Sequence, residues 1–234
     1  IFDKGLADVV LVDIVDGLPQ GKALDMLESG PVISSDAQIT GTNSYELTAD
    51  SDVVVVTSGL ARKPGMSRDD LLITNMNIIT DVVGKTSKLS PNSIHIIVTN
   101  PLDAMAQQAL KISGFPDERV VGMAGILDTA RYRTFLSQEL NVSVNSVSAY
   151  VLGGHGDTMV PVIGSTSVAG TPIDQLIEPK RLEEIVNRAR NGGAEIVNYL
   201  KTGSAYYAPS ASIAQMVEAV LFDTKEILPC TTYL

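Results

Sequence analysis

The chain has 234 residues, which is long enough for one large domain or two smaller ones with a sizeable buried core. Its 17 Lys and Arg against 27 Asp and Glu give a formal net charge of −10, which argues against nucleic acid or an anionic membrane surface as a partner. The single cysteine, Cys230, excludes an intrachain disulfide and a cysteine-based metal cluster. We expect a soluble protein, because no apolar run approaches the length of a membrane span. We expect no bound metal ion, because one cysteine and two histidines do not make a convincing ligand set.

Short apolar runs alternate with helical patterns through the first half of the chain. This alternation is typical of a parallel, doubly wound α/β sheet. The predicted elements are strands at 8–13, 37–41, 52–57, 93–98 and 120–122, with helices at 17–28, 67–88 and 102–113. Asp13 closes the first strand, where in a dinucleotide-binding unit an acidic side chain binds the adenosine ribose and favours NAD over a 2′-phosphorylated cofactor. An Asp at this place is also an ordinary turn former.

After about residue 125 the pattern changes, which predicts a second domain of α+β type over 126–234 beside an α/β domain over 1–125. Gly192 and Gly193 lie inside a clean helical pattern and permit a bend or close packing. The elements expected in this half are a helix around residue 128, strands at 147–152, 159–168 and 226–234, and helices at 181–200 and 210–221.

Two predicted strands of the first half end in polar loops, where ligands bind in open α/β sheets. The loop after strand 52–57 carries Arg62 and Arg68, and its Gly and Pro residues suit a lid. Exposed, solvated charges are the alternative for this loop. Asn100 follows strand 93–98, where its amide could donate to a substrate oxygen or could mark a helix entry before Pro101. His95 lies inside that strand, so we interpret it as structural.

One of the two histidines, His155, lies in the stretch YVLGGHGDTMVP, where neighbouring glycines allow a substrate to approach the imidazole closely. Asp128 and Arg131 are three residues apart in a predicted helix, so they share a face. A carboxylate beside the ring would set its tautomer, and a guanidinium beside it could bind a substrate carboxylate with two hydrogen bonds. A structural histidine and a surface ion pair are the alternatives.

Taken together, six motifs resemble the lactate/malate dehydrogenase family, and within it the bacterial malate dehydrogenases that are similar to lactate dehydrogenases. They are VDIVDGLPQGKALDM, VTSGLARKPGMSRDDLL, VTNPLDAM, GMAGILDTARYR, LGGHGDTMVP and KTGSAYYAP. The resemblance implies a Rossmann-type parallel sheet followed by an α+β catalytic domain. It also implies reversible, NAD-dependent oxidation of (S)-malate to oxaloacetate, a step of the tricarboxylic acid cycle.

The same resemblance implies roles for individual residues. His155 would be the proton donor and acceptor, with Asp128 as its orienting partner. Arg131 would bind the C1 carboxylate of the substrate, and Arg68 would polarise its carbonyl. Asn100 would contact the substrate or the cofactor.

Arg62 decides between malate and lactate in this reading. Lactate dehydrogenases usually carry an uncharged residue at the matching position, typically Gln, facing a methyl group. A guanidinium suits the second carboxylate of oxaloacetate instead, and a buried Arg without a partner would be penalised. The resemblance also implies that Asp13, Asn75 and the segment 98–100 (Val98, Thr99 and Asn100) bind NAD.

The first residue is Ile, and the glycine-rich turn that precedes Asp13 in the family does not occur in this sequence, so we expect a fragment. The resemblance further implies a cytoplasmic homodimer or homotetramer. Three alternatives stay open: a lactate dehydrogenase, an NAD-dependent glycoside hydrolase on a related fold, and a binding or assembly module without activity.

Overall fold

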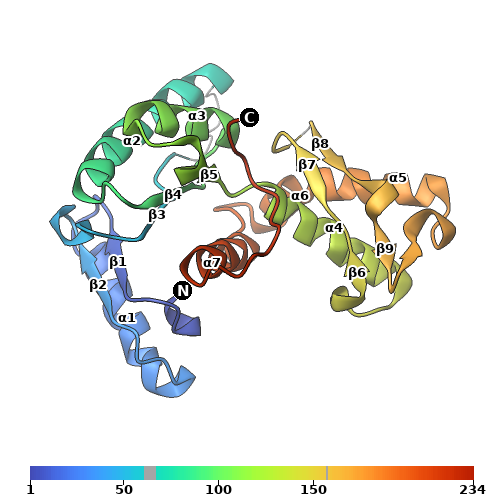
Figure 1. Cartoon of the computed structure of the whole chain (residues 1–234), viewed down its shortest axis with the longest axis horizontal. Coiled ribbons are helices and arrows are strands. Elements are labelled where there is room, and N and C mark those ends of the chain that lie inside the picture. The colour runs from blue at the N-terminus through green and yellow to red at the C-terminus, as the bar shows by residue number, and fades with distance from the viewer. Residues whose placement is uncertain (61–66, 157) are drawn as a thin grey trace.

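The computed structural model describes residues 1–60, 67–156 and 158–234, and it has two lobes joined through the long helix α4 (Gly125–Leu140) (Figure 1). One lobe contains parallel strands and helices, and the other contains short antiparallel strands. Helix α7 (Tyr207–Leu221) returns from the second lobe to pack against the first. Within these described ranges, none of the helices combines the length and the apolar character that a bilayer crossing requires.

The strands of the first lobe form two parallel groups. Strand β1 (Val9–Val12) pairs with β2 (Ile39–Thr42), while β3 (Val53–Val56), β4 (Ile94–Ile97) and β5 (Val120–Gly122) pair in that order. Their Val- and Ile-rich sequences are typical of parallel strands covered on both faces. The predicted parallel α/β architecture is therefore confirmed.

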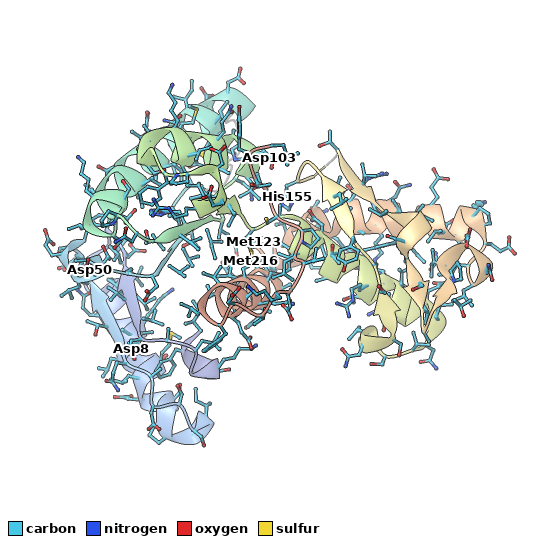
Figure 2. All side chains as sticks on the ribbon, viewed as in Figure 1. Asp8, Asp50, Asp103, Met123, His155 and Met216 are labelled. Carbon is cyan, nitrogen blue, oxygen red and sulfur yellow. The ribbon has the colours of Figure 1, made fainter. Side chains whose placement is uncertain are left out.

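Helices cover both faces of the larger strand group. Helix α1 (Leu18–Ile33) packs on β2, while α2 (Arg68–Leu89) and α3 (Leu102–Ser113) pack together over one face of β3, β4 and β5. Helix α7 covers the other face, where Met123 and Met216 meet (Figure 2). Both layers are apolar, so this sheet is buried like a sheet in a doubly wound protein.

The second lobe has one apolar core between its strands and helices. Helices α5 (Pro179–Arg190) and α6 (Gly192–Leu200) follow the strands, and α5 packs against α4. The strands are β6 (Val147–Ser148), β7 (Val151–Gly153), β8 (Met159–Pro161), β9 (Ser167–Val168) and β10 (Thr171–Pro172). The core comprises Tyr132, Leu136, Val151, Met159, Ile173, Ile185 and Ala189 among others. Short 3-10 helices complete the chain at Phe2–Lys4, Glu46–Thr48, Asp117–Arg119, Val144–Ser146, Ile163–Ser165 and Ile173–Gln175.

Four predicted elements of the second half were wrong in detail. The expected strands 147–152 and 159–168 are each broken, because β6 pairs with β9 whereas β7 pairs with β8. The expected helix 181–200 is two helices, separated at Asn191, which accordingly has a non-helical ψ of 4°.

The expected strand 226–234 has no regular secondary structure apart from one isolated bridge, between Gly122 and Thr231. Pro229 cannot donate a backbone hydrogen bond, which interrupts any ladder there.

Candidate active site

His155 lies in the loop between β7 and β8, and glycines give this loop its shape. Gly153 and Gly156 have φ angles of +79° and +113°, which residues other than glycine rarely adopt. A Cβ atom at Gly154 would lie 2.5 Å from Thr158 Oγ1. The loop therefore needs glycine for its backbone geometry as well as for access to the ring.

Asp128 meets the ring of His155 directly. Its carboxylate lies in the first turn of α4 and is only 3% exposed. His155 Nδ1 is 2.8 Å from Asp128 Oδ2. Because a carboxylate accepts hydrogen bonds, Nδ1 carries the proton, and Nε2 is left to exchange a proton with a substrate.

Arg131 lies beside the same carboxylate, as the spacing on the helix predicts. Its Nη1 atom is 3.3 Å from Asp128 Oδ1, and the guanidinium is mostly buried. Burial lowers the pKa of Arg131, and the charge of Asp128 opposes that shift. Among the described residues Asp128 engages the guanidinium through Nη1 alone, so the group keeps donor capacity for a bound anion.

Helix α6 leaves room for Arg131 because it begins with two glycines. A Cβ atom at Gly192 would lie 2.9 Å from Arg131 Cδ, and one at Gly193 would lie 3.5 Å from Nη2. The sequence allowed a bend or close packing at these two glycines, and in the structure they pack closely against the guanidinium of Arg131. Nothing in the sequence alone connects the two positions.

The loops after β3 and β4 are packed together at the carboxyl edge of the sheet. Asn75 is 1% exposed; its side chain accepts from Leu60 N at 2.8 Å and donates to Asn100 O at 2.7 Å. A Cβ atom at Gly59 would lie 2.5 Å from Thr99 Cγ2. This edge presents backbone at close range, which suits a nucleotide cofactor.

Asp13 lies at the corresponding end of β1, where Asp13 Oδ1 accepts from Val15 N at 2.8 Å. Val98 and Thr99 follow β4 directly, and Asn100 is exposed. Asp13 and residues 98–100 thus end parallel strands whose carboxyl ends form the ligand side of such sheets, which fits a dinucleotide.

The two arginines of the loop after β3 are placed only in part. Arg68 is the first residue of α2, whose start is set by a capping box between Ser67 and Asp70. The side chain of Arg68 and the whole of Arg62 lie outside the described part of the structure. The predicted meeting of Arg62 with the other site residues therefore stays a prediction.

Asp103 is a residue near the site that the sequence did not single out. It lies in the first turn of α3, three residues after Asn100, and Asp103 Oδ2 accepts from the backbone N of His155 at 3.2 Å. Figure 2 shows Asp103 and His155 near each other where the two lobes meet. The turn at Asn100 is thereby brought to the loop of His155.

The fold and this site define a class: an α/β protein with a dinucleotide edge and, where its lobes meet, a histidine paired with a carboxylate. Residues 1–122 match the NAD binding domain of lactate/malate dehydrogenase, and residues 126–234 match its alpha/beta C-terminal domain. The chain belongs to the lactate/malate dehydrogenase family. The predictions of this family, of an NAD-dependent dehydrogenase and of NAD as its cofactor are confirmed.

Individual relatives are similar over the whole chain. A malate dehydrogenase of Chloroherpeton thalassium is 59% identical, with 100% of this chain and 76% of the relative covered. The apo malate dehydrogenase structure from Picrophilus torridus is 50% identical with a TM-score of 0.97, covering 100% of this chain and 74% of that one. A Cryptosporidium parvum lactate dehydrogenase, solved with lactic acid and the cofactor, is 43% identical with a TM-score of 0.95, covering 100% and 75%.

Proposed function

We propose that this chain catalyses the reversible, NAD-dependent oxidation of (S)-malate to oxaloacetate. The observation that carries the proposal is the 2.8 Å contact between His155 Nδ1 and Asp128, with the Arg131 guanidinium on the other oxygen of the same carboxylate. NAD, when bound, accepts a hydride from the substrate carbon or returns one to it. The identity to malate dehydrogenases supports malate as the substrate.

The chain's own side chains would move the proton and bind the substrate. His155 Nε2 takes the hydroxyl proton during oxidation and returns it during reduction, while Asp128 stabilises the imidazolium. Arg131 donates to the C1 carboxylate through the part of its guanidinium that Asp128 does not engage. Asn100 donates to the substrate or cofactor, and Arg68 polarises the carbonyl.

The cofactor would lie along the carboxyl edge of the parallel strands. Asp13 binds the adenosine ribose, and residues 98–100 line the nicotinamide end. Asn75 acts there through the loops that its amide joins, since that amide is already engaged by Leu60 and Asn100. We assign the NAD-binding unit to 1–125 and the catalytic unit to 126–234.

The assembly and the compartment are part of the same proposal: a homodimer or homotetramer in the cytoplasm. Helix α1 supports self-association, because it exposes large apolar side chains that favour burial. They are Leu18, Leu24, Met26, Leu27 and Val32. Light scattering after size exclusion measures the mass, and a 24.8 kDa monomer at every concentration would contradict the proposal.

Lactate is the competing substrate, and the similarity to a lactate dehydrogenase structure supports keeping it. We assign the choice to Arg62, which would pair with the second carboxylate of oxaloacetate. The test compares kcat/KM for oxaloacetate and for pyruvate with NADH. Pyruvate as the better substrate of the unaltered chain would reject malate.

Arg62→Gln should lower kcat/KM for oxaloacetate about 100-fold more than for pyruvate, because the second carboxylate of oxaloacetate would lose its ion-pair partner. Arg133→Gln is the matched control, since Arg133 Nη2 donates to Val144 O away from this loop. Equal losses on both substrates would show that Arg62 does not read the second carboxylate.

A further inference from the structure

The carboxylate of Asp103 joins parts of the chain that are far apart in sequence. Oδ2 accepts from the backbone N of His155, 52 residues away, at 3.2 Å. Oδ1 accepts from Thr231 Oγ1, 128 residues away, at 2.7 Å. An acidic residue in the first turn of a helix is common because the helix dipole stabilises a negative charge there. That reason does not account for two oxygens that each accept from a different distant segment.

Thr231, the first hydrogen-bond partner of Asp103, is held in place by its backbone. Thr231 exchanges two backbone hydrogen bonds with Gly122 at the end of β5, at 2.8 and 2.9 Å. Pro229 O accepts from Ile126 N at the start of α4 at 2.8 Å. Three backbone hydrogen bonds fix the segment 229–231. The hydroxyl of Thr231 is therefore well placed to hold the Asp103 side chain in one rotamer.

The backbone of His155, the second hydrogen-bond partner of Asp103, needs a contact that holds it in place. Gly153, Gly154 and Gly156 surround His155, and glycine backbone is the most easily displaced. A Cβ atom at Gly154 would lie 3.2 Å from Asp103 Oδ2, so glycine at this position leaves the carboxylate room to reach the loop. The position of the ring over Asp128 depends on this backbone.

We infer that Asp103 is a positioning residue: oriented by Thr231, it fixes the backbone of His155 so that the ring stays against Asp128. The inference rests on the proposed function for its effect on turnover. Its effect on the ring does not depend on which substrate the chain takes. Asp103 touches no reacting atom in this scheme.

The test uses variants that separate hydrogen bonding from charge. Asp103→Ala removes both contacts, whereas Asp103→Asn loses the charge but can accept from His155 N and donate to Thr231 Oγ1. Asp103→Ala should lower kcat about tenfold with little change in KM for NAD, the size expected when a hydrogen bond that orders a catalytic group is lost. Asp103→Asn should recover to within about threefold of the unaltered chain.

A second readout does not need turnover. With isotope-labelled histidine, the Nδ1 proton that His155 shares with Asp128 should exchange with water about tenfold faster in Asp103→Ala and near the original rate in Asp103→Asn. The chain has two histidines, and His95→Gln assigns their signals. Thr231→Val should give a smaller change in the same direction, with Thr231→Ser as its control, and it replaces Asp103→Ala if that variant does not fold.

Unchanged kcat and unchanged proton exchange in Asp103→Ala would overturn the inference, as would equal impairment of Asp103→Asn and Asp103→Ala. Faster proton exchange in a chain that does not oxidise malate would leave the inference standing and reject the proposed function. Malate oxidation with both kcat and proton exchange unchanged in Asp103→Ala would reject the inference and leave the proposed function standing.

Discussion

Replacement of Asp128 by Asn tests the proton chemistry most directly. The side chain is 3% exposed, lies 2.8 Å from His155 Nδ1 and 3.3 Å from Arg131 Nη1, and keeps its shape in the variant. What it loses is the negative charge that stabilises a cationic ring. An amide can also donate to Nδ1, which would place the ring proton on Nε2 and block uptake of the substrate proton.

The magnitude follows from the contact. A hydrogen bond to a charged group contributes about 1.5–3 kcal/mol. Two unit charges about 4 Å apart interact by about 4 kcal/mol at an effective dielectric constant near 20. We therefore expect a loss of about 3 kcal/mol in the transition state, which is about a 100-fold lower kcat.

The effect should fall on kcat because the ring charge develops during the reaction and is absent when substrate binds. Steady-state oxidation of malate, followed by NADH absorbance, measures kcat and KM. Fluorescence titration should give an NADH Kd within about twofold of the unaltered chain, since the carboxylate of Asp128 contacts His155 and Arg131 and not the loops of the cofactor edge. Glu139→Gln is the control on the same helix, because this acid pairs with Arg181 on the surface.

The result that would refute this reasoning is a kcat within about threefold of the unaltered chain in a folded Asp128→Asn variant. A loss confined to KM would also refute it, because that would make Asp128 a substrate-binding group and not a partner of the ring.

Two further predictions concern Gly192 and His95. Gly192→Ala should raise KM for malate about tenfold with a smaller change in kcat, because the new Cβ would lie 2.9 Å from Arg131 Cδ and displace the guanidinium; an unchanged KM would show that the close contact is tolerated. His95 is fully buried, and burial and, less strongly, the charge of Arg119 lower its pKa from 6.5 to about 4. Above pH 6.5 the ring is neutral in both states, so the free energy of unfolding should fall only below that pH, by about 3 kcal/mol in total on reaching pH 4. Urea unfolding across this range measures the loss, and His95→Gln should reduce it; an equal pH dependence in that variant would exclude His95 as the cause.

The periodicity of the sequence was sufficient for much of the fold. Val- and Ile-rich runs alternating with helical patterns predicted the strands around β1 to β5 and the helices between them, because burial on both faces of a parallel sheet leaves a continuous apolar run. The interpretation of His95 as structural agrees with its burial and its 2.9 Å contact with Thr86 Oγ1.

Within the site, the three-residue spacing of Asp128 and Arg131 on one helix was enough to predict that their side chains meet. Asp128 and Arg131 share a helix face, and the structure places their charged groups 3.3 Å apart. Side chains three residues apart on a helix are neighbours whatever the rest of the fold does. The motif resemblance then identified His155 as their partner, which periodicity alone left open.

The tertiary structure decided the contacts between lobes and between distant segments. The meeting of Gly192 with Arg131, and of Asp103 with His155 and Thr231, joins positions whose separation carries no local signal. The course of residues 226–234 likewise depends on docking beside β5, where Thr231 forms one isolated bridge with Gly122 and no ladder follows. Local pattern determines which face of an element is buried, whereas the partner of that face is set by packing of the whole chain.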